Sequence, residues 1–371
     1  MKVCLICTEI FAWGKHGGFG RSTRMLGREL ARRGVSVDAV VPRRKGQRPV
    51  EGLDGIRVLS FPMTAPWLAR QLFKTSGADI FHSQEPSLST WIAQQAMPQS
   101  KHLVTFRDPR ARRDQLIELR YPSMSTVKTL AASFYEHNCL TRRAVRQADG
   151  CFCCAGGLSD KAQAVYGLPQ PPGVLASPIE IPARPMRKHP RPTVCFLARW
   201  DRRKRPERFF ELAKQFPQVR FIAVGQSQDP AWDAELRATY GGLSNVDMRG
   251  FVDQFSSNVL SEILEQSWIL VNTSAREGLP TSFLEALAHR CAILSSVNPD
   301  GVAERFGSYV RQDAFAEGLR ELLEQDRWKA KAEAGFAYVR AHHALDMVLE
   351  RHLAVYRTIL DESTITEQIH A

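Results

Sequence analysis

Two successive runs of alternating strand and helix patterns constrain the fold of this chain most strongly. Short apolar segments of strand length alternate with amphipathic segments of helix length on both sides of residues 168–192. Such alternation predicts parallel sheets covered by helices on both faces. The expected strands lie at 2–8, 36–41, 56–60, 79–82, 101–106, 151–154, 193–198, 219–225, 245–249, 268–272 and 292–296. The expected helices lie at 18–33, 65–75, 87–97, 125–147, 158–166, 206–215, 232–240, 256–266, 281–290, 313–325, 327–342 and 344–361.

A proline-rich segment separates the two runs. Residues 168–192 contain eight prolines and little periodicity, which is typical of a linker. A chain of 371 residues is also long enough for two domains. The sequence therefore predicts two doubly wound domains with a cleft between them, and ligands at the carboxyl ends of the strands. The expected boundaries are 1–170 for the first domain, 171–192 for the linker, 193–343 for the second domain and 344–371 for a final helix and tail.

The charge of the chain is strongly positive, with a formal net charge of +11 at pH 7. Most of the excess is clustered in the first half, at 21–33, 43–48, 107–113 and 142–146. Such a surface suits an anionic membrane or an anionic acceptor, and a solvated basic face would look the same. No nucleic-acid motif accompanies the charge, so nucleic acid is not an expected partner.

The apolar runs and the cysteines indicate where the protein is located and in which redox state its thiols are. No run reaches the roughly 18 apolar residues of a membrane span, and the N-terminus does not resemble a signal peptide. We expect a cytoplasmic protein, with peripheral attachment at the inner face of the membrane as an option. The eight cysteines stand mostly in apolar segments without zinc-site spacing. Cys4 and Cys7 point to opposite faces of a strand, so we expect buried, reduced thiols and no metal site.

The motif richest in chemistry runs from Glu277 to Glu285. Two carboxylates stand eight positions apart, between an expected strand and an expected helix with Thr281 or Ser282 at its N-cap. Free backbone N–H groups at a helix start attract phosphate, and carboxylates accept hydrogen bonds from sugar and ribose hydroxyls. The arrangement suits a sugar nucleotide, although a capped helix with a surface glutamate would give the same pattern.

Five cations stand between the expected strand 193–198 and the helix that Pro206 opens: Arg199, Arg202, Arg203, Lys204 and Arg205. Basic side chains are unfavourable at the positive end of a helix dipole, so we expect an anion among them. Arg199 can form a bidentate pair with phosphate, and Lys204 can act as a point charge. A solvated basic loop is the alternative.

Gly17 and Gly18 follow the first strand and open a helix, which would let the backbone approach a phosphate or sugar closely. A plain glycine turn is equally compatible with this segment. The chain has no Asp-x-Asp motif and no P-loop motif. Arg and Lys, rather than Mg²⁺, would then neutralise a leaving diphosphate, so we expect no metal and no cofactor.

Together these residues resemble the retaining two-domain glycosyltransferases of family 4, whose fold is GT-B, over nearly the whole chain. The matching segments are Gly17-Gly18, Asp79-Ile80-Phe81-His82-Ser83-Gln84, Ala148-Asp149-Gly150, Arg199 with Lys204, Gly225, Gly250-Phe251-Val252, and the Glu277 and Glu285 pair. The resemblance implies an α/β fold of two Rossmann-like domains that face each other across a deep cleft. It also implies that the last helix crosses back to the first domain.

The resemblance further implies a role for each matched residue. Arg199 and Lys204 would stabilise the departing diphosphate, Glu277 would face the donor sugar, and these three form the catalytic set. Glu285 would hold the ribose hydroxyls. The donor site as a whole would comprise Gly17, Gly18, Gly225, Arg199, Lys204, Gly278, Leu279, Pro280, Thr281 and Glu285. Transfer would retain the anomeric configuration, by attack on the same face as the leaving group.

The acceptor side departs from the family pattern. The candidates there are His82, Gln84, Arg107 and Asp108. Gln84 replaces a second histidine, and Arg107 replaces the family's active-site histidine. Arg107 cannot act as a base at neutral pH and could only bind an anion or stabilise charge, whereas Asp108 offers a carboxylate.

The function expected from this resemblance is transfer of a sugar from a nucleotide-sugar, with UDP or GDP favoured, to a glycan, lipid-linked or small-molecule acceptor in polysaccharide or glycolipid synthesis. Apolar and basic residues interleaved over 107–146 make an anionic membrane surface a candidate partner, and a helix packed on the sheet would give the same pattern. The substitutions at Gln84 and Arg107 also fit a catalytically silent nucleotide- or glycan-binding scaffold. A sugar-nucleotide epimerase or a phosphorylase is less favoured.

Overall fold

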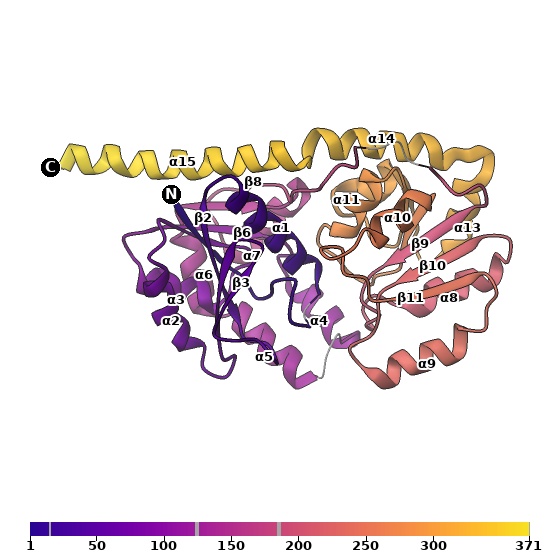
Figure 1. Cartoon of the computed structure of the whole chain (residues 1–371), viewed down its shortest axis with the longest axis horizontal. Coiled ribbons are helices and arrows are strands. Elements are labelled where there is room, and N and C mark those ends of the chain that lie inside the picture. Colours follow the sequence, from indigo (N-terminus) through magenta and orange to yellow (C-terminus); the bar gives the residue numbers. More distant parts are fainter. Residues whose placement is uncertain (15, 123–125, 184–186, 371) are drawn as a thin grey trace. The chain divides into compact units, whose positions relative to one another are not determined.

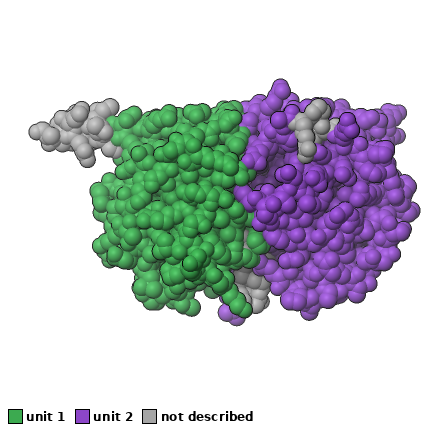
Figure 2. All heavy atoms as spheres, viewed as in Figure 1, with its two compact units in different colours: residues 1–111, 130–178, 345–371 green, residues 112–129, 179–344 purple. Residues whose placement is uncertain are grey.

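The computed structural model describes residues 1–14, 16–122, 126–183 and 187–370 (Figure 1). The chain divides into two compact units, coloured green and purple in Figure 2. Unit 1 comprises Met1–Ala111, Leu130–Pro178 and Leu345–Ala371, and unit 2 comprises Arg112–Thr129 and Ile179–Ala344. Residues 184–186 of the expected linker lie outside the described residues.

An eight-stranded sheet forms the centre of unit 1, in the order β3-β4-β2-β1-β5-β6-β7-β8. All its strand pairs are parallel except β3 with β4. The central strands are buried on both faces, which explains why they appear as unbroken apolar runs in the sequence. The strands are β1 (Lys2–Ile6), β2 (Ser36–Pro42), β3 (Val50–Leu53), β4 (Ile56–Phe61), β5 (Ile80–Ser83), β6 (Lys101–Phe106), β7 (Gly150–Cys153) and β8 (Gly173–Val174).

Helices cover both faces of this sheet. One core cluster joins β1 and β2 to α1 through Leu26 and to α15 through Leu349 and Tyr356. The other cluster lies on the opposite face of the sheet and joins it to α2 and α3 through Phe73 and Ile92. The helices are α1 (Gly18–Arg32), α2 (Ala69–Ser76), α3 (Leu88–Ala96), α5 (Thr126–Glu136), α6 (Cys139–Arg146), α7 (Ser159–Tyr166) and α15 (Leu345–His370), with 3-10 turns η1 (Pro66–Leu68) and η2 (Gly156–Leu158).

A six-stranded parallel sheet forms the centre of unit 2, in the order β11-β10-β9-β12-β13-β14. The strands β9 and β12 are therefore neighbours, although more than 70 residues separate them, and their carboxyl ends lie at the same edge. The strands are β9 (Thr193–Leu197), β10 (Arg220–Val224), β11 (Val246–Gly250), β12 (Ile269–Asn272), β13 (Ala292–Ser295) and β14 (Gly307–Tyr309).

The helices α8, α9, α13 and α14 pack on this sheet in one core cluster that includes Trp200, Phe209, Phe210 and Trp328. The helices α10 and α11 contact β9, β12 and β13 outside that cluster. The helices are α4 (Arg112–Arg120), α8 (Pro206–Gln215), α9 (Pro230–Tyr240), α10 (Val259–Gln266), α11 (Thr281–Ala288), α12 (Val302–Arg305), α13 (Phe315–Leu323) and α14 (Arg327–His342), with 3-10 turns η3 (Pro299–Gly301) and η4 (Glu324–Asp326).

Every expected strand has a counterpart, and two doubly wound α/β units are confirmed. The single helix expected at 125–147 is wrong. Two helices, α5 and α6, occupy this stretch because Asn138 caps the second one, accepting a hydrogen bond from the backbone N–H of Thr141 at 2.9 Å. The sequence also did not predict α4, α12, β3, β8 or β14.

The units and the expected domain boundaries differ in detail. Residues 112–129 belong to unit 2 rather than to the first expected domain, and β8 lies inside the expected linker. The last helix, α15, packs in the core of unit 1, which agrees with the expectation that it crosses back to the first domain. The cysteines are free thiols, and Cys139 is exposed. Cys4 and Cys7 lie in opposite core clusters of unit 1, as their spacing on a strand predicts.

Candidate functional site

The loops that follow β9 and β12 form the centre of the candidate site in unit 2. The backbone N–H of Ala275 donates to the carbonyl of Arg203 at 2.9 Å. The hydroxyl of Thr273 donates to the carbonyls of Lys204 and Arg205 at 2.7 and 2.9 Å. These bonds hold two loops that are distant in sequence side by side at the carboxyl edge of the sheet, where ligands bind in open α/β sheets.

Lys204 and Glu277 form an ion pair across these two loops. The hydroxyl of Ser274 donates to the same carboxylate oxygen of Glu277 at 2.7 Å. Burial alone would raise the pKa of Glu277, but the cations of Lys204 and Arg203 lower it below its ordinary value. The carboxylate is therefore ionised at neutral pH, and it fixes the position of the Lys204 ammonium group.

Asp201 organises the remainder of the loop after β9. One of its carboxylate oxygens accepts a hydrogen bond from the backbone N–H of Lys204 at 3.1 Å. The other lies 3.5 Å from the guanidinium of Arg199, whose side chain is 24% exposed. The structure thus brings Lys204 and Glu277 into contact, and it links Arg199 to the same loop through Asp201. Sequence reasoning did not identify Asp201 or Ser274, although both stand within five residues of predicted site residues.

Gly225 ends β10 with a positive φ of +132°, where the backbone passes very close to the loop after β9. A Cβ atom at this position would lie 1.8 Å from the carbonyl oxygen of Ala198 and 3.2 Å from the indole nitrogen of Trp200. Only glycine fits this approach, so Gly225 shapes the loop that carries Arg199.

The segment between the two glutamates opens α11. Gly278, Leu279 and Pro280 are buried, and the helix begins at Thr281. The expectation of Thr281 or Ser282 as the N-cap is wrong, because Pro280 holds the extended N-cap conformation and no side chain caps this end. Glu285 lies half-buried in the second turn. The N-terminal backbone of α11 therefore stands between Glu277 and Glu285, as the spacing predicted.

The carboxylate of Glu9 lies beside the glycine segment at the start of α1 in unit 1. Gly17 is the N-cap of α1, and the backbone N–H of Gly20 donates to the Glu9 carboxylate at 3.1 Å. A Cβ atom on Gly17 would clash with that carboxylate. Glycine at position 17 thus makes room for Glu9, which sequence reasoning did not identify.

His82 lies in the interior of unit 1 with no exposed surface. Its two ring nitrogens are hydrogen-bonded to the hydroxyls of Tyr356 and Thr105, at 2.7 and 2.8 Å. Burial holds the pKa of His82 well below its ordinary value, so the ring is neutral. The hydrogen bond between His82 and Tyr356 helps to attach α15 to unit 1, and the expected acceptor-side role of His82 stays a prediction.

The other acceptor-side candidates form a buried polar cluster. The Arg107 guanidinium donates to Gln84 at 2.5 Å and to Ser177 at 2.9 Å. The Glu85 carboxylate accepts the backbone N–H groups of Arg107 and Asp108, at 2.7 and 3.3 Å. Burial, together with the nearby Asp108, raises the pKa of Glu85 to about 8. Glu85 can therefore carry a proton at neutral pH, and sequence reasoning missed it although it directly follows Gln84.

No group of three or more His, Cys, Asp or Glu side chains among the described residues is placed to hold a metal ion. Among the same residues, none of the helices combines the length and apolar character needed to cross a membrane.

Two protein-family models match successive parts of the chain. The model of the glycosyl transferase 4-like domain matches residues 17–178, and the model described as glycosyl transferases group 1 matches residues 179–335. No protein in the curated set matches the chain by sequence.

Three proteins are among the solved structures that are similar to this chain. Sucrose-phosphate synthase from Thermosynechococcus elongatus is 18% identical, with a TM-score of 0.73 over 97% of this chain and 99% of that one. HepE of Anabaena, in complex with UDP and glucose, is 13% identical, with a TM-score of 0.70 over 95% and 99%. WaaG, a glycosyltransferase involved in lipopolysaccharide biosynthesis, is 17% identical, with a TM-score of 0.66 over 95% and 99%. At these identities the likeness shows the GT-B fold.

Proposed function

Because the chain belongs to the glycosyl transferases group 1, we propose that it moves a sugar from a nucleotide-sugar donor to an acceptor hydroxyl, with retention of configuration and without a metal ion. The observation that carries this proposal is the contact of Lys204, Glu277 and Ser274 at the adjoining carboxyl ends of β9 and β12. The UDP and glucose in the HepE structure support UDP as the first nucleotide to test. GDP is the second.

In this proposal the diphosphate binds between Arg199 and Lys204. The bond from the anomeric carbon to the phosphate oxygen breaks, and negative charge develops on the leaving group. The acceptor hydroxyl oxygen bonds to the anomeric carbon on the same face, and its proton passes to the departing diphosphate. Fixed cations stabilise such charge because they need no rearrangement as it forms. Glu277 keeps the Lys204 ammonium in place, and its own charge lets it accept hydrogen bonds from the donor sugar. Glu285 binds the ribose hydroxyls.

We further propose a glycan or lipid-linked acceptor that reaches the enzyme at the inner face of a membrane. In unit 1, Leu130 and Phe134 of α5 are 55% and 74% exposed, one helical turn apart. Arg142 and Arg143 of α6 are exposed as well. Apolar side chains near cations can dock on anionic headgroups. Sedimentation with anionic vesicles should fall in a Leu130→Ser/Phe134→Ser variant and at high salt, and equal binding to neutral vesicles would contradict this.

A thermal-shift screen without added metal tests the donor site. UDP, GDP, ADP and their sugar conjugates are compared, and a ligand at 100 times its dissociation constant should stabilise the protein by about 2.7 kcal/mol. Arg199→Ala should abolish the shift. Lys329→Ala, which removes a lysine from an exposed ion pair of the same unit, should preserve it. No shift with any nucleotide would contradict the proposal.

Two further measurements separate the reaction from binding. Transfer to an acceptor panel, followed by NMR of the product's anomeric coupling, should show the configuration of the donor sugar. Inversion would contradict the retaining mechanism, and unchanged turnover after chelation supports independence from metal. Donor binding with no transfer across the panel would favour the silent scaffold instead.

A further inference from the structure

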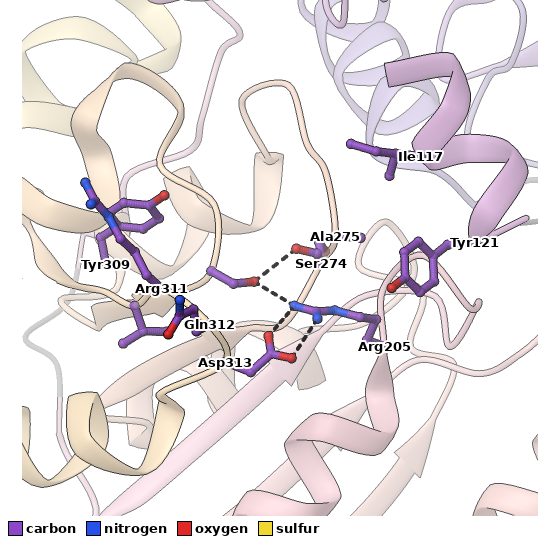
Figure 3. A pocket seen from close by; sticks show the side chains of 11 residues that line it. Ile117, Tyr121, Arg205, Ser274, Ala275, Tyr309, Arg311, Gln312 and Asp313 are labelled. Atoms are coloured by element: carbon purple, nitrogen blue, oxygen red, sulfur yellow. Dashed lines mark hydrogen bonds and ion pairs between the residues drawn. The ribbon is translucent and has the colours of Figure 1, made fainter. Parts of the chain in front are cut away.

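A cavity of about 370 Å³ lies in unit 2 at the carboxyl ends of β12, β13 and β14 (Figure 3). Its lining comes from the loops that follow these strands, from Arg205 and from α4. Arg199, Lys204 and Glu285 do not line it, so it is separate from the residues assigned to the nucleotide. The volume is at the small end of the range for ligand pockets, about 300–1,000 Å³, which limits the occupant to a part of the size of a sugar.

Ile117 of helix α4 and Tyr121, which directly follows this helix, supply one wall of the cavity. Ion pairs hold the helix against the loops after β9 and β12. Glu118 lies 2.6 Å from the guanidinium of Arg203 and 3.4 Å from that of Arg276. Figure 3 shows Ile117 and Tyr121 across the cavity from Tyr309 and Arg311. The cavity is therefore built by packed and charge-paired elements.

The ion pair between Arg205 and Asp313 forms the base of the cavity. Both terminal nitrogens of Arg205 lie 2.8–2.9 Å from the Asp313 carboxylate, and one of them also donates to the Ser296 hydroxyl at 3.1 Å. Arg205, Gln312 and Asp313 all have positive φ values, of 49°, 51° and 61°. Such conformations are costly for residues other than glycine, and they cluster at binding sites.

Several groups of the lining have no polar partner in the part of the chain that the structure describes. Arg311 is exposed, and its guanidinium has only the ring of Tyr309, with 6.0 Å to the centroid. The Gln312 amide and the hydroxyls of Tyr121 and Tyr309 have no hydrogen-bond partner there. Since Asp313 neutralises Arg205, the charge left for a ligand is the positive charge of Arg311.

We propose that this cavity binds an acidic saccharide, namely a sugar ring that carries a carboxylate or a phosphate. Arg311 pairs with the acidic group, since a guanidinium matches both anions in a bidentate geometry. Gln312 and Ser296 meet the sugar hydroxyls. The rings of Tyr121 and Tyr309 cover its apolar C–H face.

The cavity is connected to the reaction site through Ser274. This serine lines the cavity, and its hydroxyl donates to Glu277 at 2.7 Å. The acidic saccharide is thus part of the acceptor, held beside the donor sugar, and this role rests on the proposed transferase function. It gives the positively charged chain a specific anionic partner.

Binding by the full chain tests the proposal directly. Isothermal titration compares glucuronic acid, glucose 6-phosphate and uncharged glucose with the wild type, Arg311→Ala and Arg340→Ala. Arg340 is the matched control, because it is an exposed arginine of the same unit that also lies over a ring, 5.8 Å from the centroid of Phe336. At least one acidic sugar should bind about tenfold more tightly than glucose, and Arg311→Ala should remove that advantage, as expected for a hydrogen bond to a charged group. Arg340→Ala should have no effect.

The pattern of results identifies the acidic group. Preference for glucuronic acid assigns a carboxylate, and preference for glucose 6-phosphate assigns a phosphate. Three outcomes would overturn the proposal. Glucose could bind as tightly as the acidic sugars, none of the three sugars could bind, or Arg311→Ala and Arg340→Ala could lose the same amount of affinity. The UDP thermal shift is measured on the same variants. Its absence, with acidic-sugar binding intact, would refute the donor proposal alone, whereas a normal shift without acidic-sugar binding would refute the cavity alone.

Discussion

Replacing Lys204 by methionine would leave the carboxylate of Glu277 buried without its main cation. The two side chains are 14% and 10% exposed. Unit charges about 4 Å apart interact by about 4 kcal/mol at an effective dielectric constant of about 20. This agrees with the loss of about 3–5 kcal/mol when one partner of a buried ion pair is removed. The Ser274 hydroxyl remains on the carboxylate, so we expect about 3 kcal/mol.

A double-mutant cycle separates this pair energy from other effects of the substitutions. Glu277→Gln should cost less than Lys204→Met, because a lysine side chain can extend its ammonium group to solvent. The double variant should be more stable than the sum of the single changes by at least about 1 kcal/mol. The midpoint of the unit 2 thermal transition is compared among the four proteins, and about 3 kcal/mol corresponds to about 6–12 °C for a domain of this size.

The control is Lys329→Met, which breaks an ion pair between side chains that are 60% and 50% exposed. Its midpoint should equal that of the wild type. Lys204→Met should also lower turnover by about 10²–10³-fold, on the scale of a lost charge stabiliser. A wild-type midpoint for Lys204→Met, or strictly additive single changes, would refute the reasoning.

Three further outcomes test other parts of the structure. Gly225→Ala should lower the unfolding free energy of unit 2 by about 2–4 kcal/mol, through its φ of +132° and the clash with Ala198, whereas Gly242→Ala, with open space around it, should be neutral in the same thermal unfolding assay. Glu285→Gln should weaken donor binding in a titration, and unchanged affinity would contradict the ribose assignment. Burial lowers the pKa of His352 to about 4, so the unfolded chain binds this proton at a higher pH than the folded chain does, and His352 alone should contribute a loss of stability of about 1.4 kcal/mol per pH unit from about pH 6.5 down to pH 4. His352→Gln should make that dependence shallower, and an identical slope would contradict this.

The strands that sequence reasoning missed have a shared physical cause. The strands β3 and β8 are the two edges of the unit 1 sheet, and β14 is an edge of the unit 2 sheet. Central strands are buried on both faces and appear as apolar runs, whereas β3 and β8 are largely exposed and short. Their sequences, Val-Glu-Gly-Leu and Gly-Val, contain no pattern that distinguishes them from loops. The central strands of each sheet and the edge strand β11 were therefore predictable, whereas the edge strands β3, β8 and β14 were not.

The candidate site, like the two sheets, was predictable only in part. The adjacency of Lys204 and Glu277 follows from strand order, because loops after neighbouring parallel strands meet at one edge. Partners such as Ser274 and Asp201 depend on loop geometry that residue type does not encode. The sequence did not show that His82 is buried, because a histidine at a strand end can face either a ligand or the core. Only the structure shows Tyr356 of α15 beside it.

The sequence argument for an anion among the five cations after β9 is only partly right. It assumed that a ligand offsets the cost of basic side chains at a helix N-terminus. The structure shows that each cation already has a partner inside unit 2. Arg199 is near Asp201, Arg202 lies over the Trp232 ring, Arg203 pairs with Glu118, Lys204 with Glu277, and Arg205 with Asp313.

Folding therefore does not require an anion in this loop, and the charge cluster alone is not evidence of a ligand. A diphosphate that binds here has to share or exchange the carboxylates of Asp201 and Glu277. Such an exchange makes its net binding energy smaller than the charge count implies, because each new contact replaces one that already exists. The cluster then favours the state in which negative charge is greatest, which is the diphosphate as it departs rather than the intact donor.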